Sequence, residues 1–225
     1  DVLASVYGAP YEEIVSERLF RPLGMRGASF GVQALKAQGD WARPHSRDRI
    51  PGQAGAFTPW RVAELNDAYY RVPAAGGVNA SLHDMTRWLA AQMGRTSEVL
   101  PHAALDRMHA PLVETRAETR RWRALGSRIS KTWYALGWRV YDYAGETVVN
   151  HSGGVEGYGA QIAFLPERDV GIVILSNTSA KRVWRILPAF LDIELGLDDA
   201  DWLELRRETP DNGGELEELT GGEGR

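Results

Sequence analysis

The feature that most constrains the fold is a pair of strongly apolar strands joined by a glycine-rich turn. The first strand spans residues 146–151 and runs into the glycine-rich stretch 153–159. The chain then returns through the apolar residues 160–165, turns at residues 166–169, and continues into the apolar run 171–177. This order predicts three consecutive antiparallel strands.

A preceding segment extends this sheet. Residues 134–141 and 146–151 flank a turn at Gly145, which predicts a hairpin and brings the sheet to at least four antiparallel strands. The run 172–175 is apolar on both faces, so helices are expected on both sides of the sheet. One helix is predicted over residues 180–195, bent by Pro188, with an inward face of Val183, Trp184, Leu187 and Leu191. The predicted fold class is α+β: an α/β sandwich with an antiparallel sheet flanked by helices, plus a helical region.

Composition narrows the function classes. The chain has 225 residues, 44% of them hydrophobic, which is enough for one large domain or two small ones. Its net charge of −4 does not favour nucleic acid as a partner, and no apolar run is long enough for a membrane segment. It contains no cysteine, which excludes disulfides, thiolate metal sites and a cysteine nucleophile. Its histidines show no metal-ligand spacing, so no metal and no cofactor are predicted.

The N-terminal residues predict the end of an apolar helix already under way, terminated at Gly8. Pro10 opens a second helix, where its missing N–H costs little, and the apolar stripe of that helix is Tyr11, Ile14, Val15 and Leu19. We therefore expect the chain to continue a longer protein. Three regions are predicted: a mainly helical region at 1–130, the sheet and C-terminal helix at 131–197, and an acidic, glycine-rich, disordered tail at 198–225.

A glycine-rich loop over residues 72–80 leads into another helix. Ser81 and Asp84 have the spacing of a capping box, with aspartate in place of the usual glutamate or glutamine. The apolar face of this helix is Met85, Trp88, Leu89 and Met93, and Gly94 ends it.

Three segments, taken in order, resemble the serine β-lactamase and penicillin-binding-protein superfamily in its class C-like branch. The stretch His151-Ser152-Gly153 is similar to the third active-site motif of that family, Lys-Thr-Gly or His-Ser/Thr-Gly. Residues 11–25 resemble the helix that follows the second motif, and residues 76–84 resemble a Gly-Gly loop with its helix. The resemblance covers roughly residues 1–195 and implies a β-lactamase/transpeptidase-like fold.

The first two family motifs are missing. No serine has a lysine three positions later, and no tyrosine has an asparagine two positions later. In the family the serine of Ser-x-x-Lys is the nucleophile, and Tyr-x-Asn supplies a phenol for proton transfer. Both precede the segment that this chain resembles. We therefore expect the chain to be the C-terminal portion of the fold, which needs its missing N-terminal portion as a partner.

The resemblance assigns roles within the third motif. His151 takes the place of lysine, so that it is either an electrostatic anchor or a proton-relay partner. Ser152 is expected to offer its hydroxyl to a substrate carboxylate or carbonyl, and Gly153 to let the acyl group approach the backbone. The N–H of Gly154 is expected to be one of two oxyanion-hole donors.

The function implied is that of a serine hydrolase acting through an acyl-enzyme on a β-lactam, a D-amino-acid peptide or a small ester. The alternative is a non-catalytic ligand-binding relative. A small-molecule substrate is the expected partner, and a periplasmic location is favoured over a cytoplasmic one by the resemblance alone. The arginine-rich stretch 116–128 is interrupted by Glu118 and is interpreted as a solvated helix or loop.

Overall fold

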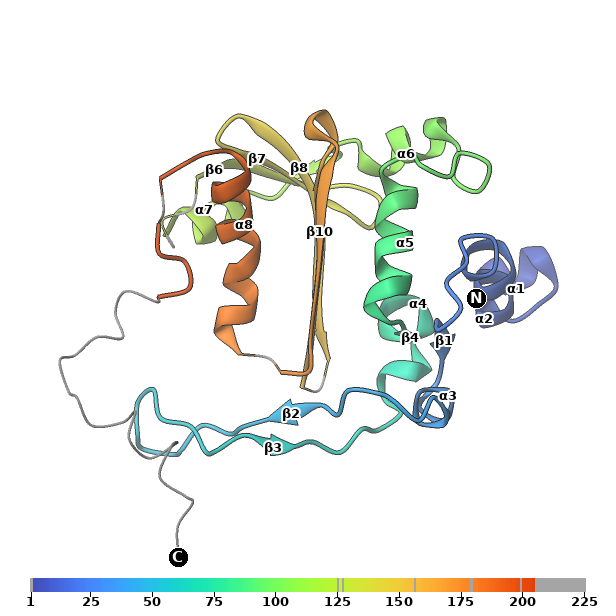
Figure 1. The fold of residues 1–225 in the computed structure, drawn as a ribbon, viewed down its shortest axis with the longest axis horizontal. Coiled ribbons are helices and arrows are strands. Elements are labelled where there is room, and N and C mark those ends of the chain that lie inside the picture. Colours follow the sequence, from blue (N-terminus) through green and yellow to red (C-terminus); the bar gives the residue numbers. More distant parts are fainter. Residues whose placement is uncertain are drawn as a thin grey trace, which may run out of the picture.

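The centre of the molecule is one six-stranded antiparallel sheet (Figure 1). The computed structural model describes residues 2–124, 126, 128–155, 157–178, 180–198 and 200–204. The strands lie in the order β10-β9-β8-β7-β6-β5, and their bounds are β5 Val113–Glu114, β6 Ile129–Tyr134, β7 Arg139–Tyr143, β8 Glu146–Val155, β9 Tyr158–Leu165 and β10 Val170–Ser176. The predicted α+β class and antiparallel sheet are confirmed.

Each face of the sheet carries its own apolar core, as the two-sided strand pattern predicts. On one face, Leu187 and Leu191 of α8 (Ile186–Glu194) pack on strand residues that include Tyr143 and Val148. On the other face, Leu89 of α5 (Leu82–Gln92) packs on residues that include Val149 and Phe164. Figure 1 shows α8 and α5 on opposite sides of the strands. Consecutive residues of β8 thus enter opposite cores.

The N-terminal region is built from short elements around a small core of Phe20, Leu23, Met25 and Ala91. Its helical elements are α1 Val2–Tyr7, α2 Tyr11–Val15, a π-helical turn Ser16–Phe20, α3 Val32–Ala37, a 3₁₀ turn Tyr69–Arg71 and α4 Pro73–Gly76. Its strand pairs are β1 Ser29–Phe30 with β4 Val78–Asn79, and β2 His45–Ser46 with β3 Arg61–Val62. Two further helices, α6 His102–His109 and α7 Arg116–Ala124, connect α5 to the sheet.

Helix α5 begins where the predicted capping box lies. The Ser81 hydroxyl accepts from the Asp84 N–H at 3.1 Å, and the Asp84 carboxylate accepts from the Ser81 N–H at 3.0 Å. The same carboxylate accepts from the N–H of Gly27 at 3.2 Å. Asp84 therefore starts the helix and also ties it to the N-terminal region.

The β2–β3 arm, residues 40–66, crosses under the end of the sheet (Figure 1). The N–H of His45 donates to the carbonyl of Asn177 at 2.9 Å, and the Asn177 amide donates to the carbonyl of Arg43 at 3.0 Å. Gly157, in the turn between β8 and β9, has φ +81°, and an added Cβ would lie 2.8 Å from the backbone of His45. Only glycine fits this turn, because both the backbone conformation and the contact exclude a side chain.

Two local predictions are corrected by the structure. Residues 134–141 do not form one strand: Tyr134 ends β6, and a turn at 135–138 with Gly137 at φ +76° separates it from β7. Residues 180–195 are not one bent helix. A 3₁₀ segment, Lys181–Arg185, precedes α8, and Pro188 lies in the first turn of α8, where its missing N–H removes no helical hydrogen bond.

The C-terminal end differs from the predicted tail at its start. Trp202 is buried, and its indole N–H donates to the Asp192 carboxylate at 2.7 Å. Residues 200–204 thus pack against α8 and are not tail. Residues 205–225 lie outside the described residues, so that the disordered tail there stays a prediction.

Candidate active site

Strand β8 loses one of its two neighbours where the third-motif residues begin. Its pairing with β7 ends at the Arg139–Asn150 pair, whereas its pairing with β9 continues to the Val155–Tyr158 pair. Residues 151–155 are therefore extended backbone with a partner strand on one side only among the described residues. Such an edge presents unpaired N–H and C=O groups to a ligand.

The third-motif residues other than His151 are exposed along this edge. Ser152, Gly153 and Gly154 are all exposed. An added Cβ at Gly153 would meet no atom within 4 Å, whereas one at Gly154 would lie 3.4 Å from the carbonyl oxygen of Tyr158 and 3.5 Å from the Trp184 ring. The lack of a side chain at Gly153 is therefore not required by packing, and it leaves the backbone open to close approach.

His151 is half-buried beside the phenol of Tyr134. The imidazole Nε2 lies 3.5 Å from the Tyr134 hydroxyl, and the two rings meet edge to face with centroids 6.4 Å apart. Burial, and next the positive charge of Arg139, lower the pKa of His151, while the negative charge of Glu118 partly opposes them. A neutral imidazole is therefore favoured at this position at neutral pH.

Behind Tyr134 lies a network that joins helix α7 to the sheet. The Arg139 guanidinium is ion-paired with Glu118 and lies 5.3 Å from the centre of the Tyr134 ring. Glu118 also accepts a hydrogen bond from the Tyr141 hydroxyl at 2.5 Å, and burial is the main cause that raises the pKa of that phenol. The prediction of a solvated helix therefore holds only in part for α7, because Glu118 points inward to Arg139 and Tyr141 of β7.

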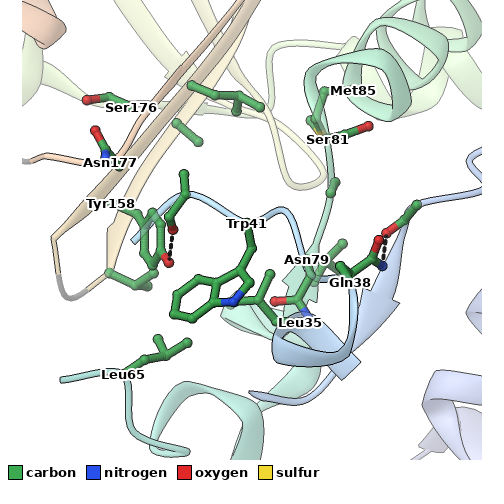
Figure 2. Close-up of a pocket in the computed structure, with 18 of the residues that line it drawn as sticks. Leu35, Gln38, Trp41, Leu65, Asn79, Ser81, Met85, Tyr158, Ser176 and Asn177 are labelled. Atoms are coloured by element: carbon green, nitrogen blue, oxygen red, sulfur yellow. Dashed lines mark hydrogen bonds between the residues drawn. The ribbon is translucent and has the colours of Figure 1, made fainter. Parts of the chain in front are cut away.

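A pocket of about 880 Å³ lies between α5, α3, the arm and the ends of β9 and β10. Figure 2 shows Trp41 between Tyr158 and Leu35, with Ser81 and Met85 on the α5 side. Val155 of β8 lines this pocket, but none of the four predicted site residues does. The pocket thus adjoins the end of the exposed edge and does not enclose the third motif.

The four predicted residues lie together on one strand, and their assigned roles stay predictions. Sequence reasoning missed Tyr134 on β6, which contacts His151. It also missed the ion pair between Arg139 on β7 and Glu118 on α7, whose charges act on the pKa of His151. The only signal was the polar residue at 118 inside an arginine-rich helix. Among the described residues, no group of three or more His, Cys, Asp or Glu side chains could hold a metal ion.

The comparisons identify the family. The family model described as "Beta-lactamase" matches residues 1–190, so the chain belongs to the beta-lactamase family. An octameric penicillin-binding protein homologue from Pyrococcus abyssi has a similar structure, with a TM-score of 0.69 and 24% identity. A class C beta-lactamase is similar with a TM-score of 0.62 and 19% identity. Both likenesses cover 88% of this chain, and they show a β-lactamase/transpeptidase-like fold.

Curated relatives include two fungal unguisins hydrolases. The one from Aspergillus campestris (strain IBT 28561) is 25% identical over 169 residues, which is 74% of this chain and 29% of the relative. The one from Aspergillus violaceofuscus (strain CBS 115571) is 32% identical over 77 residues, which is 32% of this chain and 14% of the relative. The chain likewise spans 40% of the penicillin-binding protein homologue and 54% of the class C beta-lactamase. No described helix has the length and hydropathy to cross a membrane.

Proposed function

We propose that this chain is the C-terminal portion of a serine hydrolase that works through an acyl-enzyme. The observation that carries the proposal is the one-sided edge of β8, on which His151, Ser152, Gly153 and Gly154 follow one another. Extended backbone with exposed glycines suits an acyl group, which needs backbone hydrogen bonds and close approach. Membership of the beta-lactamase family supports the reaction class.

Each residue of this edge takes one role. The N–H of Gly154 donates to the oxyanion, and removal of such a donor typically costs about 10²–10³ in rate. The Ser152 hydroxyl donates a hydrogen bond to a carbonyl or carboxylate oxygen of the substrate. Gly153 leaves room for the acyl group, and His151 contacts the substrate or the proton-transfer groups.

The nucleophile comes from a portion of the protein outside this chain, where the Ser-x-x-Lys and Tyr-x-Asn motifs of the family belong. The fraction of each relative that the chain covers is consistent with this. The exposed Leu82 and Leu175 beside the 880 Å³ pocket provide apolar surface for that portion to cover.

Substrates are a β-lactam, a D-amino-acid peptide or a small ester. The relatives named as hydrolases favour turnover over mere binding. A non-catalytic binding protein is the competing function, because this chain by itself lacks a nucleophile with its lysine.

The test begins with the coding sequence upstream of Asp1. A Ser-x-x-Lys followed by a Tyr-x-Asn supports the enzyme, and absence of both supports the binding protein. The longer polypeptide is then assayed with a cephalosporin, a D-alanyl-D-alanine peptide and a nitrophenyl ester, beside a variant in which the Ser-x-x-Lys serine is alanine. Turnover that the alanine variant loses is expected; equal rates in both would overturn the proposal.

A further inference from the structure

The contact between Tyr134 and the imidazole of His151 bears on which ring nitrogen of His151 carries the hydrogen. Among the described residues, Tyr134 is the hydrogen-bond partner of the His151 ring, at 3.5 Å from Nε2. A neutral imidazole has one nitrogen with hydrogen and one without, and the partner of one nitrogen decides the state of the other. The direction of this single contact therefore sets what His151 offers to the exposed edge.

The cation beside the phenol favours one direction for this hydrogen bond. The Arg139 guanidinium lies 5.3 Å from the centre of the Tyr134 ring, and a cation at a phenol ring withdraws electron density from its oxygen. The hydroxyl is thereby a stronger donor and a weaker acceptor. Tyr134 is expected to donate to Nε2, which leaves the hydrogen of the neutral ring on Nδ1.

The surrounding charges favour the neutral ring. The groups that face His151 are the Tyr134 phenol on β6, Arg139 on β7 and Glu118 on α7, and Glu118 is already engaged by Arg139 and by the Tyr141 hydroxyl. A second cation beside Arg139 is disfavoured, and the lowered pKa of His151 agrees with this, with burial as its first cause and Arg139 as its second.

We propose that Tyr134, backed by the Arg139–Glu118 ion pair, is a positioning residue that holds His151 as an uncharged Nδ1–H donor. The consequence for substrates rests on the proposed function. An uncharged N–H donor at this edge suits the carbonyl of an ester or amide better than a free carboxylate. Uncharged acyl substrates are thus the preferred class at this position. The lysine found in other members of the family would give the opposite preference.

The first test reads the ring directly by long-range ¹H–¹⁵N NMR of the histidine side chains at neutral pH, with His151→Gln to assign the signals. The wild-type chain is expected to show the Nδ1–H tautomer for His151. Tyr134→Phe is expected to shift it to the Nε2–H tautomer, which predominates for free imidazole side chains in water, and to raise its pKa. Tyr158→Phe is the matched control, because that phenol donates to the carbonyl of Ala42 at 2.6 Å.

Arg139→Lys and Arg139→Gln distinguish the effect of the Arg139 charge on the pKa of His151 from the effect of its packing. Lysine keeps the positive charge and should keep the pKa of His151 low, whereas glutamine should raise it. A wild-type ring that is cationic at neutral pH, or that carries its hydrogen on Nε2, would overturn the inference. So would a Tyr134→Phe spectrum identical with the wild type.

The second test compares substrates on the longer polypeptide. Tyr134→Phe is expected to lower kcat/KM for a neutral ester about tenfold, as for other residues that orient a functional imidazole. His151→Lys is expected to move the preference toward a carboxylate-bearing substrate. An unchanged preference would count against the inference. Absence of hydrolysis in every variant would defeat the proposed function, whereas the NMR result stands without it.

Discussion

The sheet and the N-terminal region differ in how completely they bury their apolar residues. On the sheet, Tyr143, Val148, Ala163 and Leu165 are each 0% exposed. In the N-terminal region, Val2 is 79% exposed and Val6 is 71% exposed, and Val62 and Val72 are exposed as well. The strands in the middle of the sheet thus find their packing partners within this chain. On its two edge strands Val113 and Leu175 are exposed, as the named valines of the N-terminal region are.

The same difference in burial is seen between the strand that carries the third motif and the pocket that adjoins it. The third motif lies on the well-packed sheet, with β9 on one side and the arm at its end. The pocket beside it is lined by N-terminal elements and α5, among them the exposed Val78 and Leu82, and by the ends of β9 and β10. The third motif is therefore held by strands and by the arm of this chain, whereas apolar side chains of the pocket beside it face solvent.

Asp192 gives the largest expected effect, because it joins α8 to the sheet. Asp192 is 3% exposed, and its carboxylate accepts hydrogen bonds from Tyr143 at 2.5 Å, Trp202 at 2.7 Å and Arg128 at 2.6 Å. Asp192→Ala should destabilise the chain by about 3 kcal/mol, since buried donors lose their acceptor. Urea unfolding followed by tryptophan fluorescence measures this. A loss no greater than that of Asp84→Ala would contradict the comparison of the two regions.

Two glycines of the sheet should respond differently to alanine. At Gly171 an added Cβ would lie 2.9 Å from the Ala163 oxygen and 3.1 Å from Leu89, so Gly171→Ala should cost about 1–3 kcal/mol. At Gly153 nothing lies within 4 Å, so Gly153→Ala should change stability by less than about 0.5 kcal/mol.

In the longer polypeptide, Gly171→Ala and Gly153→Ala distinguish a loss of stability from a loss of activity. Gly153→Ala should lower kcat/KM about 100-fold, because it obstructs the approach of the acyl group to the edge. Thermal unfolding and a kinetic assay on both variants measure the two effects. If Gly153→Ala kept full activity, the edge of β8 would not be the acyl site.

Protonation of Asp84 gives the smallest expected effect, and this effect appears only at acid pH. Burial by itself raises the pKa of Asp84, but hydrogen bonds from the Ser81 hydroxyl and from the N–H groups of Ser81 and Gly27 outweigh it and lower the pKa below its ordinary value. A carboxyl with a lowered folded-state pKa stabilises the fold above its unfolded pKa of about 3.9 and loses this contribution as pH falls through the folded value.

The check is urea unfolding at about pH 6 and about pH 3. The wild type should be less stable at the lower pH, because part of this contribution is lost there. Asp84→Asn, which keeps the shape of the side chain, should show a smaller difference between the two pH values. Equal acid sensitivity of both proteins would show that other carboxyl groups account for the loss.

The strands of the sheet and the start of α5 could be predicted because each depends on residues close together in the sequence. Alternation and apolar runs marked β8, β9 and β10, and the Ser81–Asp84 spacing marked the start of α5. The turn at 135–138 was missed because Trp138 is apolar and continues the strand pattern, although its side chain enters the core. Local spacing carries no information on such a change of direction.

The sequence predicted only the part of the candidate site that lies on one strand. His151 to Gly154 are consecutive, so that they can be recognised as a sequence motif. Tyr134 lies beside His151 because β7 pairs with both β6 and β8, and Glu118 is joined to β7 by its ion pair with Arg139. These interactions join residues that are separated along the chain. Such long-range contacts depend on strand register, which the sequence of each strand alone does not define.

The central claim is that the third motif of this chain completes an acyl-transfer site whose nucleophile lies outside it. Intact-mass spectrometry after incubation with an activated ester and with a fluorescent penicillin tests this directly, on the 225-residue chain and on the longer polypeptide. The longer polypeptide should take up one acyl group on the serine of Ser-x-x-Lys, and the 225-residue chain should take up none. A stoichiometric adduct on any serine of the 225-residue chain would contradict the account.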